Sequence, residues 1–172
     1  MKRSYHPLVL LLMLALAGTV IGHPRPAQAR LLTWTLSGSV GYGHEVHPLH
    51  GPQATNIMVT GGLGFIRDYI RLELGALGAY GALRTHNPER FNLEFRPMVR
   101  LTPPLIPLYG RLIFAGLNPF DASRAVGFGW ALGGYLPLGR LAPFAEVAAL
   151  PRLIDRQFHW IVEGRVGLGV RL

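Results

Sequence analysis

Apolar and polar residues alternate along the last part of the chain. From residue 160 to residue 172, every second position is apolar or glycine, in the order Trp160, Val162, Gly164, Val166, Leu168, Val170 and Leu172. The positions between them include Glu163, Arg165 and Arg171. Successive side chains of a strand point to opposite faces, so a period of two predicts a strand whose faces meet different surroundings.

The same period recurs in seven earlier segments. The predicted strands are residues 32–42, 56–66, 70–80, 91–101, 108–117, 126–136, 141–150 and 160–172. In the fifth and seventh of these, only Arg111 and Glu146 mark the polar face. Beyond the N-terminal region no segment has a sustained period of 3.6 residues. The pattern therefore predicts a single all-β domain.

The links between the predicted strands alternate in character. Those at 67–69, 102–107 and 137–140 are short or bounded by proline, whereas those at 43–55, 83–90, 118–124 and 151–156 are generally longer and more polar. In an antiparallel barrel, successive links lie at alternate ends. The short links should therefore lie at one end and the long links at the other. We therefore expect an eight-stranded antiparallel up-and-down barrel.

The first 29 residues have the features of a targeting segment. Lys2 and Arg3 precede the apolar run LVLLLMLALAG, and the tripeptide Ala27-Gln28-Ala29 follows it. This order predicts a cleaved secretory signal peptide over residues 1–29 and a barrel over residues 30–172. The alternative, a membrane-anchoring helix, is opposed by four helix-breaking residues: Gly18, Gly22, Pro24 and Pro26. The chain has no cysteine, so its stability must come from noncovalent packing and backbone pairing.

The net charge of +8 does not indicate nucleic-acid binding. Cleavage of the signal would remove Lys2, Arg3 and Arg25 and leave 14 arginines against 9 acidic residues. These arginines are scattered singly along the chain, whereas nucleic-acid binding requires a clustered basic patch.

The chemistry of the two faces indicates which one meets lipid. The polar face consists mostly of Gly, Ala, Ser and Thr with charges of both signs: Arg71, Glu73, Glu94, Arg96, Arg100, Arg111, Glu146, Glu163, Arg165 and Arg171. Small residues suit the narrow interior of an eight-stranded barrel, and a soluble surface would carry more charge. The other face carries large apolar side chains, with aromatic candidates for interfacial anchors at Trp34, Tyr42, Phe65, Phe91, Trp130 and Trp160.

Strand length agrees with this assignment, because about 9 to 11 residues cross a bilayer as a tilted strand. No strand edge can stay unpaired in hydrocarbon, so the last strand must close onto the first. The alternative is a soluble periplasmic barrel similar to a lipocalin, which would bury the apolar face around a small apolar ligand.

With these features the chain resembles the small OmpA/OmpX-type outer-membrane β-barrel proteins over nearly all of residues 30–172. The resemblance implies a transmembrane, porin-like fold in a Gram-negative outer membrane, contact with its lipid, and insertion by the barrel-assembly machinery. In that family the machinery recognises an alternating last strand with a terminal aromatic residue. Val166, Leu168, Val170 and Leu172 match the alternation, and the terminal residue here is leucine.

The predicted interior charges favour a plug over a diffusion pore. Buried charges need partners, and eight strands enclose little space, so we expect the ten charged residues of the polar face to form a salt-bridged network. The predicted function is that of a monomeric structural or surface-interaction barrel that reaches a ligand through its long loops, without a cofactor.

Two further groups of residues have chemical potential. His44, His47 and His50 recur at three-residue intervals beside Glu45, and imidazole and carboxylate are ligands for zinc or copper. The competing interpretation is a solvated loop. A lipid-modifying enzyme would need a nucleophile near a base, such as Ser37 or Ser39 near His159, but no triad-like spacing is visible, and we predict no enzyme.

Overall fold

The computed structural model describes residues 32–47, 53–81, 91–116, 126–154 and 157–172. These residues form eight strands: β1 (Leu32–His47), β2 (Gln53–Phe65), β3 (Ile70–Gly81), β4 (Phe91–Leu101), β5 (Leu108–Ala115), β6 (Val126–Tyr135), β7 (Leu141–Ile154) and β8 (Gln157–Arg171). The predicted signal peptide lies outside the described residues and stays a prediction. No helix in the described ranges is long and apolar enough to cross a membrane.

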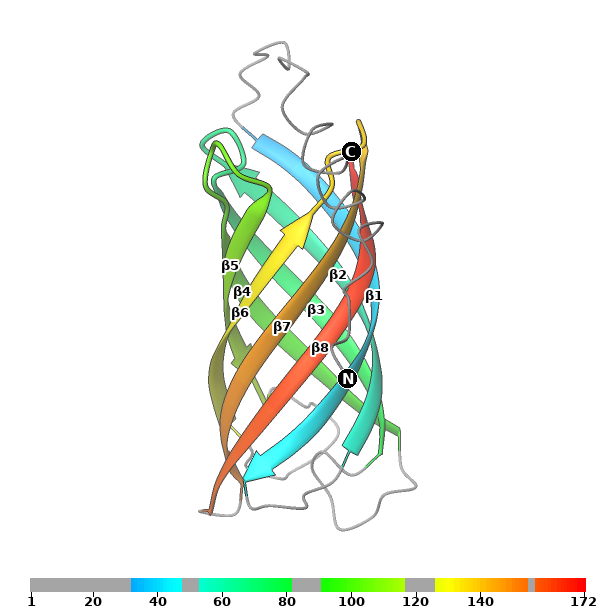
Figure 1. Ribbon diagram of the computed structural model, residues 1–172, viewed down its shortest axis with the longest axis vertical. Coiled ribbons are helices and arrows are strands. Elements are labelled where there is room, and N and C mark those ends of the chain that lie inside the picture. Colours follow the sequence, from blue (N-terminus) through cyan, green and yellow to red (C-terminus); the bar gives the residue numbers. More distant parts are fainter. Residues whose placement is uncertain (1–31, 48–52, 82–90, 117–125, 155–156) are drawn as a thin grey trace, which may run out of the picture.

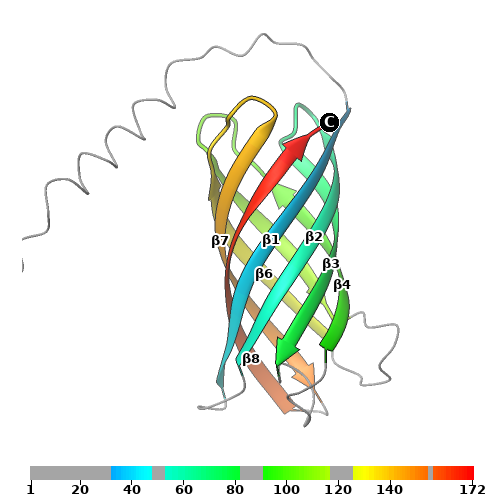
Figure 2. The same ribbon diagram turned by 90° about the vertical axis from the view of Figure 1, so that its right-hand side faces the viewer.

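Each strand pairs in antiparallel fashion with its neighbour in the chain, and β8 pairs with β1 to close the barrel (Figures 1 and 2). The closing register runs from Thr35 opposite Arg171 to His47 opposite Trp160, with a bulge between Glu45 and His47. Closure gives the first and last strands a partner on both sides, so that their backbone groups form the hydrogen bonds that lipid cannot offer. The predicted all-β, eight-stranded up-and-down barrel is confirmed.

The short links gather at one end of the barrel, beside the C-terminus (Figure 1). The link between β2 and β3 is a tight turn in which the Tyr69 amide donates to the Ile66 carbonyl over 3.2 Å. Ile66, Arg67 and Asp68 have φ angles of 50°, 58° and 72°. Residues other than glycine seldom adopt this left-handed conformation, so contacts must hold the turn.

Two of the predicted long links are wrong at their boundaries. Residues 43–47 belong to β1, and most of residues 151–156 are strand, because β7 extends to Ile154 and β8 begins at Gln157. Arg152 pairs with His159 across these strands. Their polar residues suggested a loop, but in a barrel wall a polar residue can instead face the lumen while the strand continues to pair.

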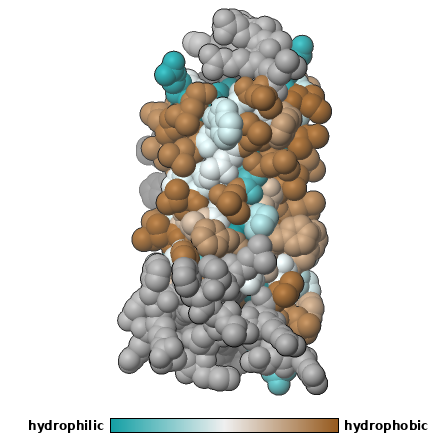
Figure 3. Space-filling view, turned by 180° about the vertical axis from the view of Figure 1, so that it is seen from behind, coloured by the Kyte–Doolittle hydropathy of each residue, from teal (hydrophilic) through white to brown (hydrophobic). Residues whose placement is uncertain are grey.

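The outer face of the wall is apolar, and Figure 3 shows this face as a broad hydrophobic band. Trp34 is 61% exposed and Leu132 is 71% exposed. Tyr42 and Trp130 also face outward, Phe65 and Trp160 are partly exposed, and the Phe91 side chain lies outside the described part. Outward aromatic rings contact one another towards the end opposite the short links, in the pairs Phe114–Phe128, Trp130–Trp160 and Phe158–Trp160.

The inner face differs from the prediction in one respect. It holds the expected small and charged residues, but also a layer of buried large apolar side chains: Met58, Leu77, Met98, Ile113, Leu150 and Ile161. The sulfur of Met58 lies 2.9 Å from Nη1 of Arg165. Together with small residues such as Ala54 and Ala131, these side chains form one buried apolar cluster inside the barrel.

Candidate functional site

The structure brings the predicted interior charges together inside the barrel. Nine of the ten predicted residues are buried, and Arg171 is partly exposed. The orientation of β5 and β7, which the sequence marked only through Arg111 and Glu146, is also as expected, because both side chains are buried.

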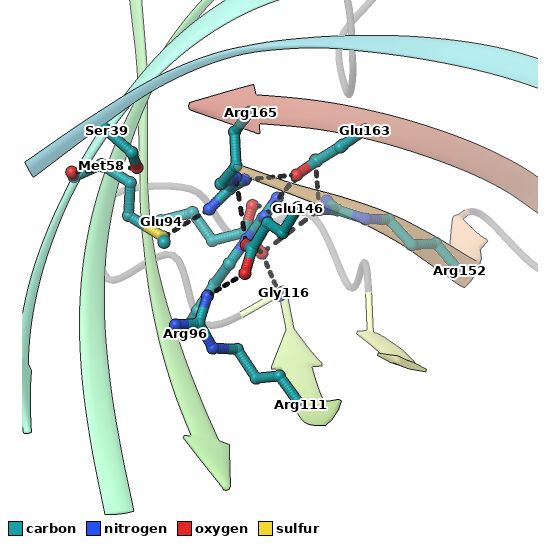
Figure 4. A network of polar contacts seen from close by, with 10 residues as sticks. All are labelled: Ser39, Met58, Glu94, Arg96, Arg111, Gly116, Glu146, Arg152, Glu163 and Arg165. Carbon is teal, nitrogen blue, oxygen red and sulfur yellow. Dashed lines mark hydrogen bonds and ion pairs between the residues drawn. The ribbon is translucent and has the colours of Figure 1, made fainter. Parts of the chain in front are cut away.

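Glu163 on β8 is the centre of the network (Figure 4). Its side chain is fully buried and accepts two hydrogen bonds from Arg96, at 2.6 Å and 2.8 Å. Arg165, two residues along β8, donates to the same carboxylate over 2.6 Å. A forked guanidinium on both oxygens of a carboxylate is among the strongest polar contacts in proteins.

A second carboxylate, Glu94, extends the network towards the end opposite the short links. Its oxygens lie 3.4 Å from Nε of Arg96 and 3.3 Å from Nη2 of Arg152. The Gly116 backbone amide also donates to Glu94, over 2.7 Å, just after β5 ends. Glu94 therefore connects β4 with β7 and with the first residue beyond β5.

Two more carboxylates extend the network towards the short links. Glu146 accepts from Arg111 over 2.6 Å and from the Tyr109 hydroxyl over 2.8 Å, and lies 3.5 Å from Nε of Arg165. Glu73 forms an ion pair with Arg111, in which its carboxylate lies 2.8 Å from Nε. The barrel centre is thus joined to the region where Glu73 meets Arg71, at 3.6 Å.

Asp68 ends the network in the turn between β2 and β3. Its carboxylate binds Arg71 through Nε at 3.0 Å and Arg171 at 2.6 Å, and accepts a 3.3 Å contact from the Thr33 hydroxyl. Burial raises the pKa of Asp68, but hydrogen bonds and charge attraction from Arg71, with a further contribution from Arg171, hold it below its usual value. These contacts also fix the left-handed turn.

The contacts form one alternating chain of acids and arginines from the turn to the centre of the lumen. Arginine cannot release its proton in a protein, so each buried guanidinium needs a negative or polar partner. Removing one carboxylate would take a close partner away from the buried arginines beside it, at a cost of about 3–5 kcal/mol. The network therefore resists any rearrangement that separates its charges.

His159 does not meet Ser37 or Ser39. Its Nδ1 atom contacts the Glu45 carboxylate instead. Ser37 and Ser39 stand opposite Gly169 and Gly167, well along β8 from His159. The serine and histidine arrangement considered from the sequence is therefore not formed.

The three spaced histidines do not all lie in a loop as expected. His44 and His47 belong to β1, and His50 lies outside the described residues. Among the residues that the structure describes, no group of three His, Cys, Asp or Glu could hold a metal ion. A metal site that includes His50 stays a prediction.

Sequence reasoning missed four interior residues that contribute contacts. Glu45 and Arg152 continue the inward parity of their strands, at two-residue spacing from Gly43 and Leu150, but were assigned to links. Tyr109 stands two positions before Arg111 and could have been found by the same rule. Asp68 in a three-residue polar link gave no periodic signal.

The residues of the predicted assembly signal lie on β8 or directly after it. Val166, Leu168 and Leu172 are exposed on the outer face, and Val170 is partly exposed. This placement agrees with an apolar, lipid-facing row.

The closed antiparallel barrel, its apolar wall and its charged interior give the chain the fold that small outer-membrane β-barrel proteins have. Among solved structures, the chain is similar to Neisserial surface protein A (NspA), with a TM-score of 0.57 and 9% sequence identity. The similarity covers 82% of this chain and 97% of that chain, and at this identity it shows the fold alone. No protein-family model matches the chain, and no curated protein matches its sequence.

Proposed function

We propose that the protein is a monomeric barrel of a bacterial outer membrane, plugged by its interior salt bridges, that acts as a structural or surface-interaction protein through its long links. The observation that carries the proposal is the inversion of the two faces. Large apolar side chains cover the outer wall, while Arg96, Glu163 and their partners are buried inside.

The inversion argues against the soluble alternative. A lipocalin-like carrier keeps an apolar ligand in an apolar interior and exposes charge to water. Here a ligand would meet charged side chains, and an aqueous surface would meet Trp34, Val59 and Leu132, each more than half exposed. Lipid outside the wall gives both faces favourable surroundings.

Close packing of side chains in the lumen supports the proposed plug as much as their charge does. Arg96, Arg152 and Glu163 are each at most 1% exposed at the level of the lumen where they meet. An ion passing through would have to displace arginine and carboxylate pairs such as Arg96 and Glu163. We therefore propose that the inserted barrel conducts poorly. From the apolar alternation of the last strand, Val166 to Leu172, we also propose that insertion depends on the barrel-assembly machinery.

Cell fractionation followed by electrophoresis tests the location. Recovery in the outer membrane, with a gel mobility that changes on boiling, is expected of a closed lipid-embedded barrel. Recovery in the soluble periplasmic fraction would overturn the proposal. If the protein is recovered in the outer membrane, deletion of residues 83–90 or 118–124 tests the role of the long links. The deletion should leave the mobility change intact and remove surface binding.

A further inference from the structure

A small cavity lies in the lumen at the end where the short links gather. Its volume is about 60 Å³, room for a few water molecules or one small ion. Its wall includes a residue from each short link, namely Asp68, Thr102 and Gly139. The cavity is thus distinct from the central network around Glu163.

The cavity is strongly basic. Its lining includes five arginines and a single acidic residue, Asp68; the arginines are Arg71, Arg100, Arg111, Arg140 and Arg171. Asp68 already pairs with two of these arginines, Arg71 and Arg171. Arg111 is held by Glu73 and Glu146 from the interior side. Arg100 and Arg140 are therefore left without an acidic partner in the lining of the cavity.

Among the described residues, Arg100 is a buried cation with no carboxylate within ion-pair distance, although Glu73 lies near enough to attract it. Arg100 is 8% exposed, and among the described residues it makes no ion pair. Its guanidinium lies 3.8 Å from the centre of the Tyr109 ring and 5.2 Å from that of Tyr135, while Nε donates to the Thr102 hydroxyl over 3.3 Å. The rings hold the guanidinium plane in place, and its two terminal nitrogens have no hydrogen-bond acceptor in the described part of the chain.

We propose that this cavity binds a small oxyanion of the phosphate class, with Arg100 as the residue that grips it. A fixed guanidinium plane presents paired N–H donors that match two oxygens of a phosphate group. The Thr102 hydroxyl accepts from Arg100 and so keeps its own proton for donation to the ligand. Arg171, with a side chain 37% exposed, and the exposed Arg140 stand at the opening and attract anions.

The phosphate group can come from two sources, a free phosphate ion or the headgroup of a lipid at the membrane surface. Titration calorimetry of the whole protein in maltoside micelles separates them. One series adds sodium phosphate against a sodium chloride reference of equal ionic strength. The other adds short-chain phosphatidylglycerol in phosphate-free buffer.

Arg100→Gln should weaken phosphate binding at least about tenfold, since a hydrogen-bonded charge contributes roughly this much to affinity. Arg67→Gln is the matched control, because it removes one charge at the same end of the barrel from a residue outside the cavity lining. It should leave binding unchanged. Arg100→Lys keeps the charge but lacks the planar guanidinium, so it should also weaken phosphate binding. It serves as the test variant if Arg100→Gln fails to fold.

The outcomes are distinct. Binding of inorganic phosphate alone, or tighter binding of the phospholipid, supports the site and identifies the source. An absence of heat in both series, or equal weakening by Arg67→Gln and Arg100→Gln, would overturn it and leave the tyrosine rings as the sole partners of Arg100. Either result leaves the proposal of a lipid-embedded barrel untouched, since fractionation tests that separately.

Discussion

Several carboxylates inside this barrel each contact two arginines, which makes their removal costly. Glu163 binds Arg96 and Arg165, and both stay charged at any pH at which the protein folds. Glu163→Gln should lower the free energy of unfolding by about 3–5 kcal/mol, because the two buried guanidiniums lose their closest counter-charge. They keep the longer contacts to Glu94, at 3.4 Å from Arg96, and to Glu146, at 3.5 Å from Arg165. Urea unfolding of the barrel in lipid vesicles, followed by tryptophan fluorescence, measures the loss.

Glu45→Gln is the comparison for this change. Glu45 is also a buried interior carboxylate, but its partner is His159, and an imidazole can become neutral where a guanidinium cannot. The loss of stability should therefore be clearly smaller than for Glu163→Gln. Equal losses in the two variants would contradict the view that unpaired arginine charge sets the cost.

Acid sensitivity should be traceable to Asp68. The folded pKa of Asp68 lies below the unfolded value, so its contribution to stability is complete above the unfolded pKa and is lost as pH falls through the folded pKa. Stability should therefore decline on acidification below about pH 4. Asp68→Asn should lower stability at neutral pH and make this acid decline shallower.

Unfolding curves at a series of pH values between 2 and 7 check the Asp68 prediction. Asp68→Glu is the control that retains a carboxyl group, and it should keep more of the acid dependence than Asp68→Asn. A decline equally steep in wild type and Asp68→Asn would assign the effect to other groups.

At the scale of the strand, β8 shows why the small residues of the two faces are not equivalent. Gly164 faces outward, and a Cβ added there would meet nothing within 4 Å. Gly167 faces inward, where an added Cβ would lie 2.6 Å from Cζ of Phe144 and 2.7 Å from Cβ of Ser39. The inner glycine makes room for neighbouring strands, whereas the outer one faces open space.

Gly167→Ala should therefore lower the free energy of unfolding by about 1–3 kcal/mol through overpacking. Gly164→Ala, three residues away on the same strand, should stay within about 0.5 kcal/mol of wild type. Urea unfolding of both variants provides the measurement. A larger effect at Gly164 would mean that the faces of β8 are reversed.

Strand boundaries were the part of each element that the sequence predicted least well. The period of two identified all eight strands and the inward face of each, including Arg111 on β5 and Glu146 on β7. Arg152 was assigned to a link, because a polar residue beside proline resembles a loop in one dimension. The pairing of Arg152 with His159 on β8 shows that β7 continues to this point.

At the scale of the whole molecule, the effect of a charged substitution on the outer wall depends on whether lipid or water surrounds the barrel. Val59 lies near the middle of β2 and is 53% exposed, whereas Leu32 begins β1 and is 50% exposed. In a membrane barrel, Val59→Arg should cost about 2–4 kcal/mol and Leu32→Arg about 0–1 kcal/mol, because the penalty for arginine depends on depth. In a soluble barrel neither change would matter much.

Refolding of both variants into lipid vesicles, with urea unfolding as the readout, tests the depth dependence. Similar exposure of the two wild-type side chains makes Leu32→Arg a matched control for Val59→Arg. Two equal and small effects would contradict a lipid-facing wall.

The sequence by itself determined the number of strands, their antiparallel order and the direction of each face, because alternation is a local property that every strand records in its own residues. Tertiary structure decided which charges meet. Glu163 and Arg96 are 67 residues apart in sequence. In the described part of the chain Arg100 forms no ion pair, although Arg111, its partner in the register, forms two. These contacts depend on the shift of each strand relative to its neighbours and on the length of the side chains that cross the lumen. Neither can be deduced from the spacing of residues along one strand.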